Sequence, residues 1–216
     1  MLVRDRMTRD LHTVRADMAV ADALSLIREK NIRRLPVVDK HGRLIGIVAE
    51  KDLLYASPSP ATSLSVYEIG YLLSKLKIKE VMNQEVVTIS ADAPLEEAAM
   101  VMVDNKIGAL PVMEGKDLAG IITETDIFKA LLEMLGGRDP GLRITLSVED
   151  KPGILSQITG TIAGLGGDII ALGTFYGKDE HCEYGTLMIK ISGMDKDAFI
   201  KAMEEIQAEF IDIREV

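Results

Sequence analysis

Gly120-Ile121-Ile122-Thr123-Glu124-Thr125-Asp126 carries the strongest signal of fold in this chain of 216 residues. Its apolar positions are typical of the end of a β-strand, and a hydroxyl and a carboxylate follow where a helix would begin. If Thr123 or a neighbour caps that helix, free backbone N–H groups point outward beside both side chains. The carboxylate of Asp126 can then accept hydrogen bonds from both hydroxyls of a ribose, while the hydroxyl and the helix N-terminus serve a phosphate. The alternative is an ordinary strand-to-helix cap.

The same pattern occurs twice, which favours a duplicated unit over a chance cap. Gly46-Ile47-Val48-Ala49-Glu50-Lys51-Asp52 matches it at an offset of 74 residues. Upstream, Leu35-Pro36-Val37-Val38 matches Leu110-Pro111-Val112-Met113 at an offset of 75, so one residue is lost in the turn between. The same alignment pairs Asn31 with Asn105 after a slip of one residue.

Each repeat predicts a β-α-β-β-α unit. Apolar residues at helical spacing predict helices at about 20–30 and 95–105, and a last helix begins near Asp52 or Asp126. The β-rich runs predict strand pairs at 35–38 with 44–48 and at 110–112 with 118–122. Two such units packed face to face would bury the sheet face that each leaves open, with a cleft between them.

These repeated motifs resemble a tandem pair of CBS domains, often called a Bateman module. The resemblance covers about residues 1–134 and rests on the strands LPVVD (35–39) and LPVME (110–114), the two strand ends and Val81-Met82. It implies an α+β fold in which two β-α-β-β-α units pack as a pseudo-twofold pair. It also implies a regulatory adenine nucleotide in the cleft: AMP, ADP or ATP, with NAD and S-adenosylmethionine as further options.

The two predicted half-sites are unequal. Asp126 has Thr123 three residues before it, whereas Asp52 has Ala49 there. We therefore expect the site built around the second repeat to be the stronger one.

Arg33 and Arg34 precede a repeated strand, at a place that the family geometry turns toward the cleft, so we expect at least one of them to pair with phosphate oxygens. A guanidinium group suits phosphate oxygens, although a solvated loop is the alternative. Residues 86–89, Ile107 and Pro111 are candidates for an apolar adenine slot, and equally for plain core. The predicted nucleotide-binding residues are Arg33, Arg34, Asp52, Thr88, Ile107, Pro111, Thr123 and Asp126.

The last third of the chain predicts a different domain. Residues 135–141 form a linker by composition, and residues 142–216 follow a ferredoxin-like βαββαβ order in which Asp195 caps a helix that runs to about Glu209. A connecting helix with a Ser65/Glu68 capping box is expected between the repeats. The predicted domain boundaries are 1–56, 57–77, 78–134, 135–141 and 142–216.

The turn Asp150-Lys151-Pro152-Gly153-Ile154-Leu155 resembles the ACT domain, over about residues 142–216. This resemblance implies pairing of two subunits and binding of an amino acid or similar small effector at the turn and the facing subunit. Asp168 stands where family members often carry Asn, and an acid there disfavours a carboxylate ligand, so dimerisation alone is the alternative. The predicted effector-binding residues are Asp150, Pro152, Gly153, Ile154, Leu155 and Asp168.

Composition argues against several classes of protein. A net charge of −9 opposes a nucleic-acid-binding surface spread over the chain, and a single Cys fits a reducing compartment. The N-terminus has no apolar run typical of a signal peptide, and no apolar stretch reaches the ~18 residues of a membrane span. The adjacent pair His181-Cys182 has no further ligands at metal spacing. We expect a cytoplasmic protein without a metal, a membrane segment or nucleic acid.

The combination of two CBS units and one ACT domain resembles the bacterial acetoin utilisation proteins of the AcuB type. The two resemblances predict a non-catalytic homodimer or higher homo-oligomer that senses an adenine nucleotide and allosterically regulates an unidentified enzyme. The alternative is a structural interaction module with vestigial pockets that holds a partner enzyme. A hydrolase is disfavoured because no general base or metal set accompanies Asp126.

Overall fold

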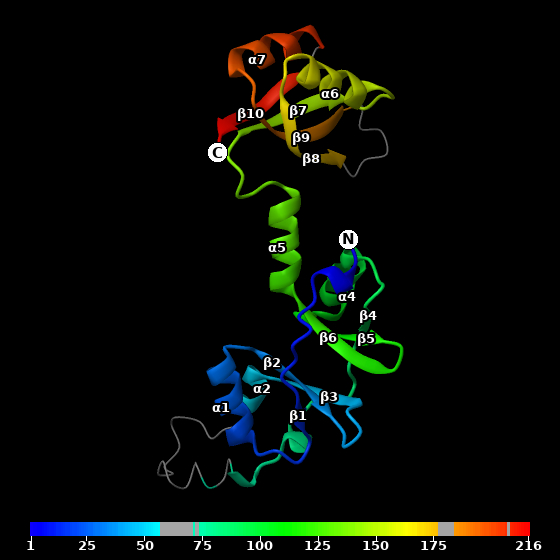
Figure 1. Cartoon of the computed structure of the whole chain (residues 1–216), viewed down its shortest axis with the longest axis vertical. Helices are drawn as coiled ribbons and strands as arrows, with labels where there is room; N and C mark the ends of the chain where they lie inside the picture. Colours follow the sequence, from blue (N-terminus) through cyan, green and yellow to red (C-terminus); the bar gives the residue numbers. More distant parts are fainter. Residues whose placement is uncertain (57–70, 72–73, 177–183, 207) are drawn as a thin grey trace. The chain divides into compact units, whose positions relative to one another are not determined.

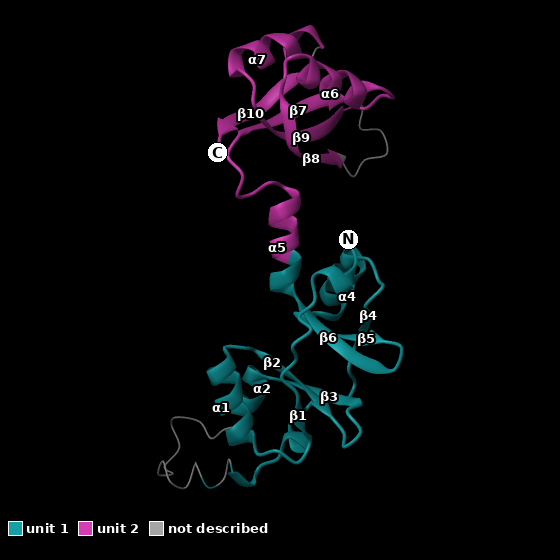
Figure 2. Ribbon diagram, in the orientation of Figure 1, with its two compact units in different colours: residues 1–127 teal, residues 128–216 magenta. Residues whose placement is uncertain are grey.

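The computed structural model describes residues 1–56, 71, 74–176, 184–206 and 208–216. The chain divides into two compact units, unit 1 with residues 1–127 and unit 2 with residues 128–216 (Figure 2). Most of the predicted connecting helix, and the pair His181-Cys182, lie outside the described residues. Within the described part, no helix is both long enough and apolar enough to cross a membrane.

The first repeat of unit 1 is a three-stranded sheet packed against two helices (Figure 1). Strand β1 (Val14–Arg15) pairs in parallel with β2 (Arg34–Val38), which pairs antiparallel with β3 (Leu44–Ala49). Helix α1 (Val20–Lys30) has the predicted bounds, and α2 (Glu50–Tyr55) follows β3 directly. The buried side chains of α1 recur at helical spacing and face the core, as the sequence predicts.

The second repeat has the same order of elements. Strand β4 (Ile89–Ser90) pairs in parallel with β5 (Ala109–Glu114), which pairs antiparallel with β6 (Asp117–Thr123). Helix α4 (Leu95–Asn105) again has the predicted bounds, and α5 (Glu124–Met134) begins where β6 ends. The β-α-β-β-α order predicted for both repeats is therefore confirmed.

The ends of α1 and α4 correct the alignment of the two repeats. Asn31 and Lys106 follow these helices with φ values of 50° and 53°, and they are the two described non-glycine residues with positive φ. A left-handed residue at this place satisfies the last helical carbonyls. The shared conformation pairs Asn31 with Lys106 at the regular offset of 75, so the predicted slip to Asn105 is wrong.

The opening segment of each repeat packs on the other repeat, which the sequence-based division into 1–56 and 78–134 did not anticipate. Thr8 forms a β-bridge with Ile121 of the second repeat, and Asn83 forms the matching bridge with Ile47 of the first. Short 3₁₀ helices, Val3–Asp5 and Ile78–Glu80, lie in these exchanged segments.

Two glycines make room for the exchange. A Cβ atom at Gly46 would stand 2.7 Å from the sulfur of Met82, and a Cβ atom at Gly120 would stand 2.7 Å from the sulfur of Met7. Any larger residue would push the exchanged methionine away, so the glycine that opens each strand-end motif has a packing role.

Unit 2 is a four-stranded antiparallel sheet in the order β10-β7-β9-β8, with two helices on one face (Figure 1). Its elements are β7 (Leu142–Glu149), α6 (Ile154–Gly164), β8 (Asp168–Tyr176), β9 (Tyr184–Ser192), α7 (Lys196–Glu205) and β10 (Glu209–Glu215). This βαββαβ order is the expected one. Asp195 caps α7 by accepting a 2.9 Å hydrogen bond from the Ala198 N–H, but α7 ends at Glu205 because residue 209 already belongs to β10.

Residues 135–141 are not a free linker, because they pack on the sheet of unit 2. The ammonium group of Lys190, whose side chain is only 4% exposed, donates a 2.7 Å hydrogen bond to the Gly136 carbonyl just beyond α5. The backbones of Gly141 and Val216 exchange two hydrogen bonds of 2.9 and 3.0 Å. These contacts make the segment an integral part of unit 2.

Asp39, in the turn between β2 and β3, gives a prediction for pH dependence. The backbone N–H of Arg43, its guanidinium group and the backbone N–H of His41 lower the pKa of Asp39 to about 2. A depressed pKa adds stability that is complete above pH ~4 and is lost as the pH falls toward ~2. We expect the wild-type protein to unfold at a higher urea concentration than Asp39→Asn at neutral pH, with a gap that closes below pH ~4. A gap that stays constant with pH would contradict this role.

Candidate functional site

Two pockets open between the repeats of unit 1. The Asp126 pocket, lined by residues of 8–12, 31–36 and 121–126 with Gly108, has a volume of about 360 Å³. The Asp52 pocket, lined by residues of 47–52, 81–87 and 106–111 with Arg34, has a volume of about 340 Å³. These segments correspond at offsets of 74 and 75 residues, so the duplication of the sequence has produced a duplicated pocket.

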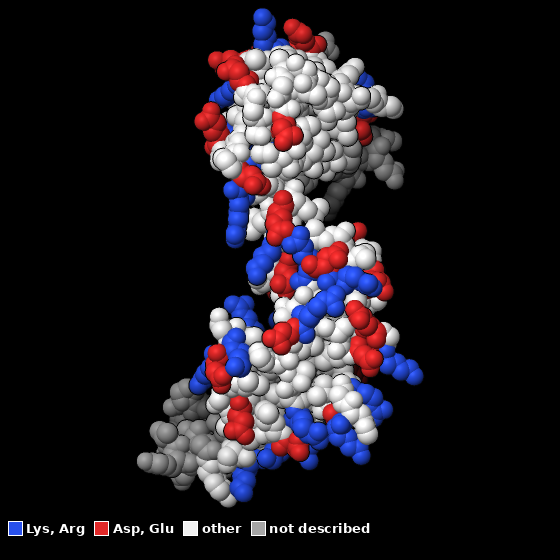
Figure 3. All heavy atoms as spheres, in the orientation of Figure 1, with Lys and Arg blue, Asp and Glu red and all other residues white. Residues whose placement is uncertain are grey.

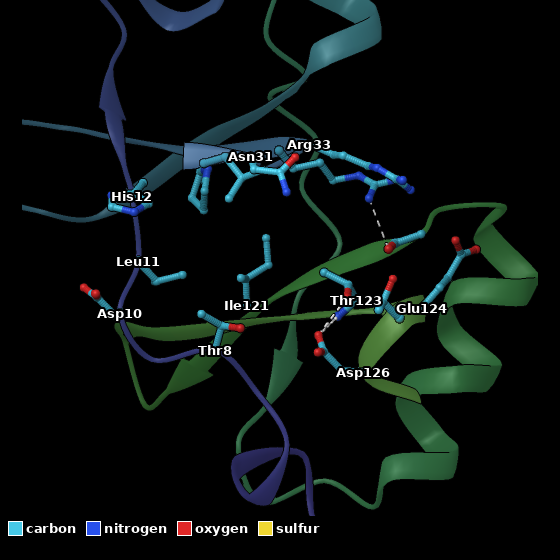
Figure 4. Close-up of a pocket in the computed structure, with 15 residues that line it drawn as sticks. Thr8, Asp10, Leu11, His12, Asn31, Arg33, Ile121, Thr123, Glu124 and Asp126 are labelled. Carbon is cyan, nitrogen blue, oxygen red and sulfur yellow. Dashed lines mark hydrogen bonds between the residues drawn. The ribbon is translucent and has the colours of Figure 1, made fainter. Parts of the chain in front are cut away.

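In the Asp126 pocket, the start of α5 faces the first repeat (Figure 4). Oδ2 of Asp126 accepts hydrogen bonds from the Thr123 backbone N–H at 2.9 Å and from the Thr123 hydroxyl at 2.7 Å. The carboxylate therefore caps the first turn of the helix. Among the described residues, Oδ2 accepts both hydrogen bonds to the Asp126 carboxylate, so Oδ1 is available to the hydroxyls of a ligand.

The Asp52 pocket repeats this arrangement without the hydroxyl. Oδ2 of Asp52 accepts one hydrogen bond, 3.0 Å long, from the Ala49 backbone N–H. The difference between Thr123 and Ala49 thus changes how firmly the acidic side chain is held.

Because the Thr123 hydroxyl already donates to Asp126, it can accept a hydrogen bond from a ligand hydroxyl, but it can donate to a phosphate only by leaving Asp126.

The predicted nucleotide-binding residues divide between the two pockets instead of forming one site. Arg33, Thr123 and Asp126 line the Asp126 pocket; Asp52, Ile107 and Pro111 line the Asp52 pocket; Arg34 lines both; and Thr88 lines neither and is exposed. The prediction missed Ile32 and Pro36, which line the Asp126 pocket. The repeat offset of 75 identifies them as the counterparts of Ile107 and Pro111, so this signal was present in the sequence.

Arg34, Gly108 and Glu124 meet at the boundary of the two repeats. Nη1 of Arg34 donates a 3.2 Å hydrogen bond to the Gly108 carbonyl, drawn as a dashed line in Figure 4. A Cβ atom at Gly108 would stand 2.6 Å from Oε2 of Glu124 and 2.9 Å from Nη2 of Arg34. The absence of a side chain at position 108 therefore lets an acid and a base approach the same point. Glu124 was not among the predicted site residues.

The predicted effector residues of unit 2 do not converge within one chain. Gly153 precedes α6 with φ of 93°, and Asp150 and Pro152 beside it are exposed. Leu155 is 37% exposed, whereas the side chain of Ile154 packs in the hydrophobic core. Asp168 begins β8 at the opposite end of the sheet, about 25 Å from the turn by the length of a nine-residue strand.

No group of three or more metal-binding side chains occurs in the described ranges. Acidic and basic side chains alternate on the face of unit 1 shown in Figure 3, and they do not gather into one basic surface.

Comparison with known proteins identifies the first unit. The family model "CBS domain" matches residues 3–59 and 78–133. A CBS domain-containing protein of Dictyostelium discoideum is 35% identical over 136 residues, which cover 62% of this chain and 94% of that protein. A Vibrio cholerae protein described as an acetoin utilization protein (AcuB) is 35% identical, with a TM-score of 0.51 over 61% of this chain and 90% of its own.

Two similar structures contain adenine compounds. The CBS domain pair of protein MJ0100, in complex with 5′-methylthioadenosine and S-adenosyl-L-methionine, is 27% identical with a TM-score of 0.52 and covers 64% of this chain and 98% of its own. CBSX2 in complex with AMP is 32% identical with a TM-score of 0.52 and covers 62% of this chain and 97% of its own. The family model and the shared fold agree with the repeated strand-end motif, and the chain belongs to the CBS domain family.

Proposed function

We propose that this protein is a regulatory sensor that binds an adenine nucleotide in the pockets of its CBS pair. The observation that carries the proposal is the carboxylate of Asp126, which is held by Thr123 at a helix start and keeps one oxygen for a ribose. Ile32 and Pro36 line the same pocket and offer an apolar surface for the base. The candidate ligands are AMP, ADP and ATP, with NAD and S-adenosylmethionine as further options.

The proposal also assigns roles to unit 2, as an ACT domain that joins two chains into a homodimer. Helix α6 has no charged residue, and the face of unit 2 shown in Figure 3 is largely uncharged, which favours contact with another protein surface. In a dimer, Asp168 of one chain can approach the Asp150–Gly153 turn of the other, where the start of α6 suits a small anionic effector. Nucleotide binding would shift the arrangement of the two chains and so regulate a partner enzyme.

The protein acts without catalysis in this proposal, in the cytoplasm and in the context of acetoin utilisation. The similarity to the Vibrio cholerae protein supports that context. The second candidate function is an interaction module that holds a partner enzyme and has vestigial pockets. The capping role of Asp52 and Asp126 favours it, because a cap alone would also explain these carboxylates.

Thermal unfolding with a panel of ligands tests the proposal. The panel holds AMP, ADP, ATP, NAD, S-adenosylmethionine and the common amino acids, with GMP and GTP as controls for the base. A ligand present at 100 times its Kd and bound only to the folded state adds about 2.7 kcal/mol of stability. We expect the midpoint to rise with at least one adenine compound and not with the guanine nucleotides.

The other results of this experiment decide between the parts of the proposal and its alternatives. No shift with any adenine compound would favour the interaction module. If chromatography detects hydrolysis of the bound nucleotide, that result would contradict the non-catalytic role. A shift with an amino acid would give unit 2 a ligand of its own, whereas no such shift would restrict unit 2 to dimerisation.

A further inference from the structure

Arg34 is the one residue, among those described, that lines both the Asp126 pocket and the Asp52 pocket. It begins β2, pairs with Ala49 at the end of β3, and reaches across to the carbonyl of Gly108 in the other repeat. Its counterpart in the second repeat is Ala109, which pairs with Thr123. The guanidinium group of Arg34 is therefore shared by the two pockets and has no counterpart in the second repeat.

The remaining charges of the two pockets differ. The Asp126 pocket has one further cation, Arg33, while Glu124 and Asp10 add negative charge to that of Asp126. In the Asp52 pocket, Glu85 adds negative charge to that of Asp52, while Lys51 and Lys106 stand at the positions of Thr125 and Asn31. A phosphate in the Asp126 pocket thus depends more on Arg34 than a phosphate in the Asp52 pocket does.

We propose that Arg34 is a shared phosphate-binding group, through which a phosphorylated nucleotide in one pocket weakens binding of a second phosphorylated nucleotide in the other. The inference rests on the proposed function and adds regulation between its two sites. One guanidinium carries one positive charge, and its Nη1 already donates to Gly108. The second phosphate therefore meets a cation whose charge the first phosphate has already neutralised. Adenosine has no phosphate, so its binding to the two pockets is independent of Arg34.

Calorimetric titration of the whole 216-residue chain with AMP and with adenosine measures this coupling. Asp52→Asn and Asp126→Asn each weaken AMP in one pocket and leave an amide oxygen to cap the helix. At AMP concentrations that leave the weakened pocket empty, each variant reports the affinity of the other pocket alone. In the wild-type protein, we expect the second AMP molecule to bind 5- to 150-fold more weakly than AMP binds to the same pocket in the variant whose other pocket is weakened. This is roughly the usual range of coupling between sites. The two dissociation constants of adenosine in the wild-type protein should equal those measured for each pocket in the single variants.

Arg34→Gln and Arg33→Gln are a matched pair that isolates the shared group. The amide of the Arg34→Gln variant keeps a donor for the Gly108 carbonyl but has no charge, so the coupling between two AMP molecules should fall to within about 2-fold of none. Arg33 lines only the Asp126 pocket, so its replacement should weaken AMP there and leave the coupling in place. Circular dichroism of both variants verifies that they are folded.

Several outcomes would overturn the inference while the proposed function survives. One is that AMP has the same dissociation constants in the wild-type protein as in the variants with one weakened pocket. The others are that adenosine shows the same coupling as AMP, or that the coupling persists in Arg34→Gln. A failure of both AMP and adenosine to bind the wild-type protein would instead overturn the inference and the proposed function together.

Discussion

Replacing Asp126 by Asn is expected to weaken binding of AMP by about 10- to 100-fold, because a hydrogen bond to a charged group contributes ~1.5–3 kcal/mol. A carboxylate oxygen accepts from a ribose hydroxyl, whereas the amide NH₂ that replaces one of the oxygens only donates. The amide oxygen can still accept from the Thr123 N–H, which Oδ2 of Asp126 does at 2.9 Å. The unfolding midpoint of the ligand-free protein should therefore change little.

Asp126→Ala separates binding from capping. It removes the acceptor for both hydrogen bonds from Thr123, so we expect it to lower the free energy of unfolding by about 0.5–2 kcal/mol as well as to abolish ribose recognition. Calorimetric titration gives the affinity and urea unfolding gives the stability. A loss of affinity in Asp126→Ala but none in Asp126→Asn would show that the carboxylate acts only as a cap.

Asp52→Asn is the matched control in the other pocket. Asp52 is held by one hydrogen bond, from the Ala49 N–H, and no hydroxyl orients it. A less firmly oriented carboxylate contributes less to binding, so we expect its replacement to cost less affinity than that of Asp126. Equal losses from the two variants would contradict the inequality of the pockets.

The local structure of unit 1 was predictable from sequence because each element carries its own periodic pattern. The helices α1 and α4 begin and end as expected, since their apolar residues define a buried face. The exchange of opening segments was not predictable in this way. Both repeats present nearly the same strand ends, and hydrophobic spacing does not say which copy a segment such as Thr8 or Asn83 pairs with.

The sequence predicted which residues belong to the site better than it predicted which of them share a pocket. Asp126, Thr123 and Arg33 do line one pocket, but Ile107 and Pro111 line the other pocket, with Asp52. The buried ammonium of Lys190 carried no sequence signal. A lysine in a strand ordinarily points to solvent, and only the tertiary contact with Gly136 explains its burial.

Phe199→Ala is expected to have the largest effect on stability, lowering the free energy of unfolding of unit 2 by about 3–5 kcal/mol. Phe199 of α7 is fully buried, and its ring meets that of Phe210 edge to face, with centroids 6.1 Å apart and an interplanar angle of 77°. Truncation loses this ring contact and leaves a cavity between the helix and the sheet. Urea unfolding followed by circular dichroism measures the change.

Phe175→Ala is the matched control, because Phe175 of β8 is 58% exposed and its loss should change stability by no more than about 0.5 kcal/mol. The two units have separate cores, so Phe199→Ala should leave the AMP-dependent rise in the unfolding midpoint of unit 1 intact. Loss of that rise in the variant would mean that nucleotide binding requires a folded unit 2. A larger effect from Phe175→Ala than from Phe199→Ala would mean that the exposed face of the sheet, and not the helix-covered core, carries the stability of unit 2.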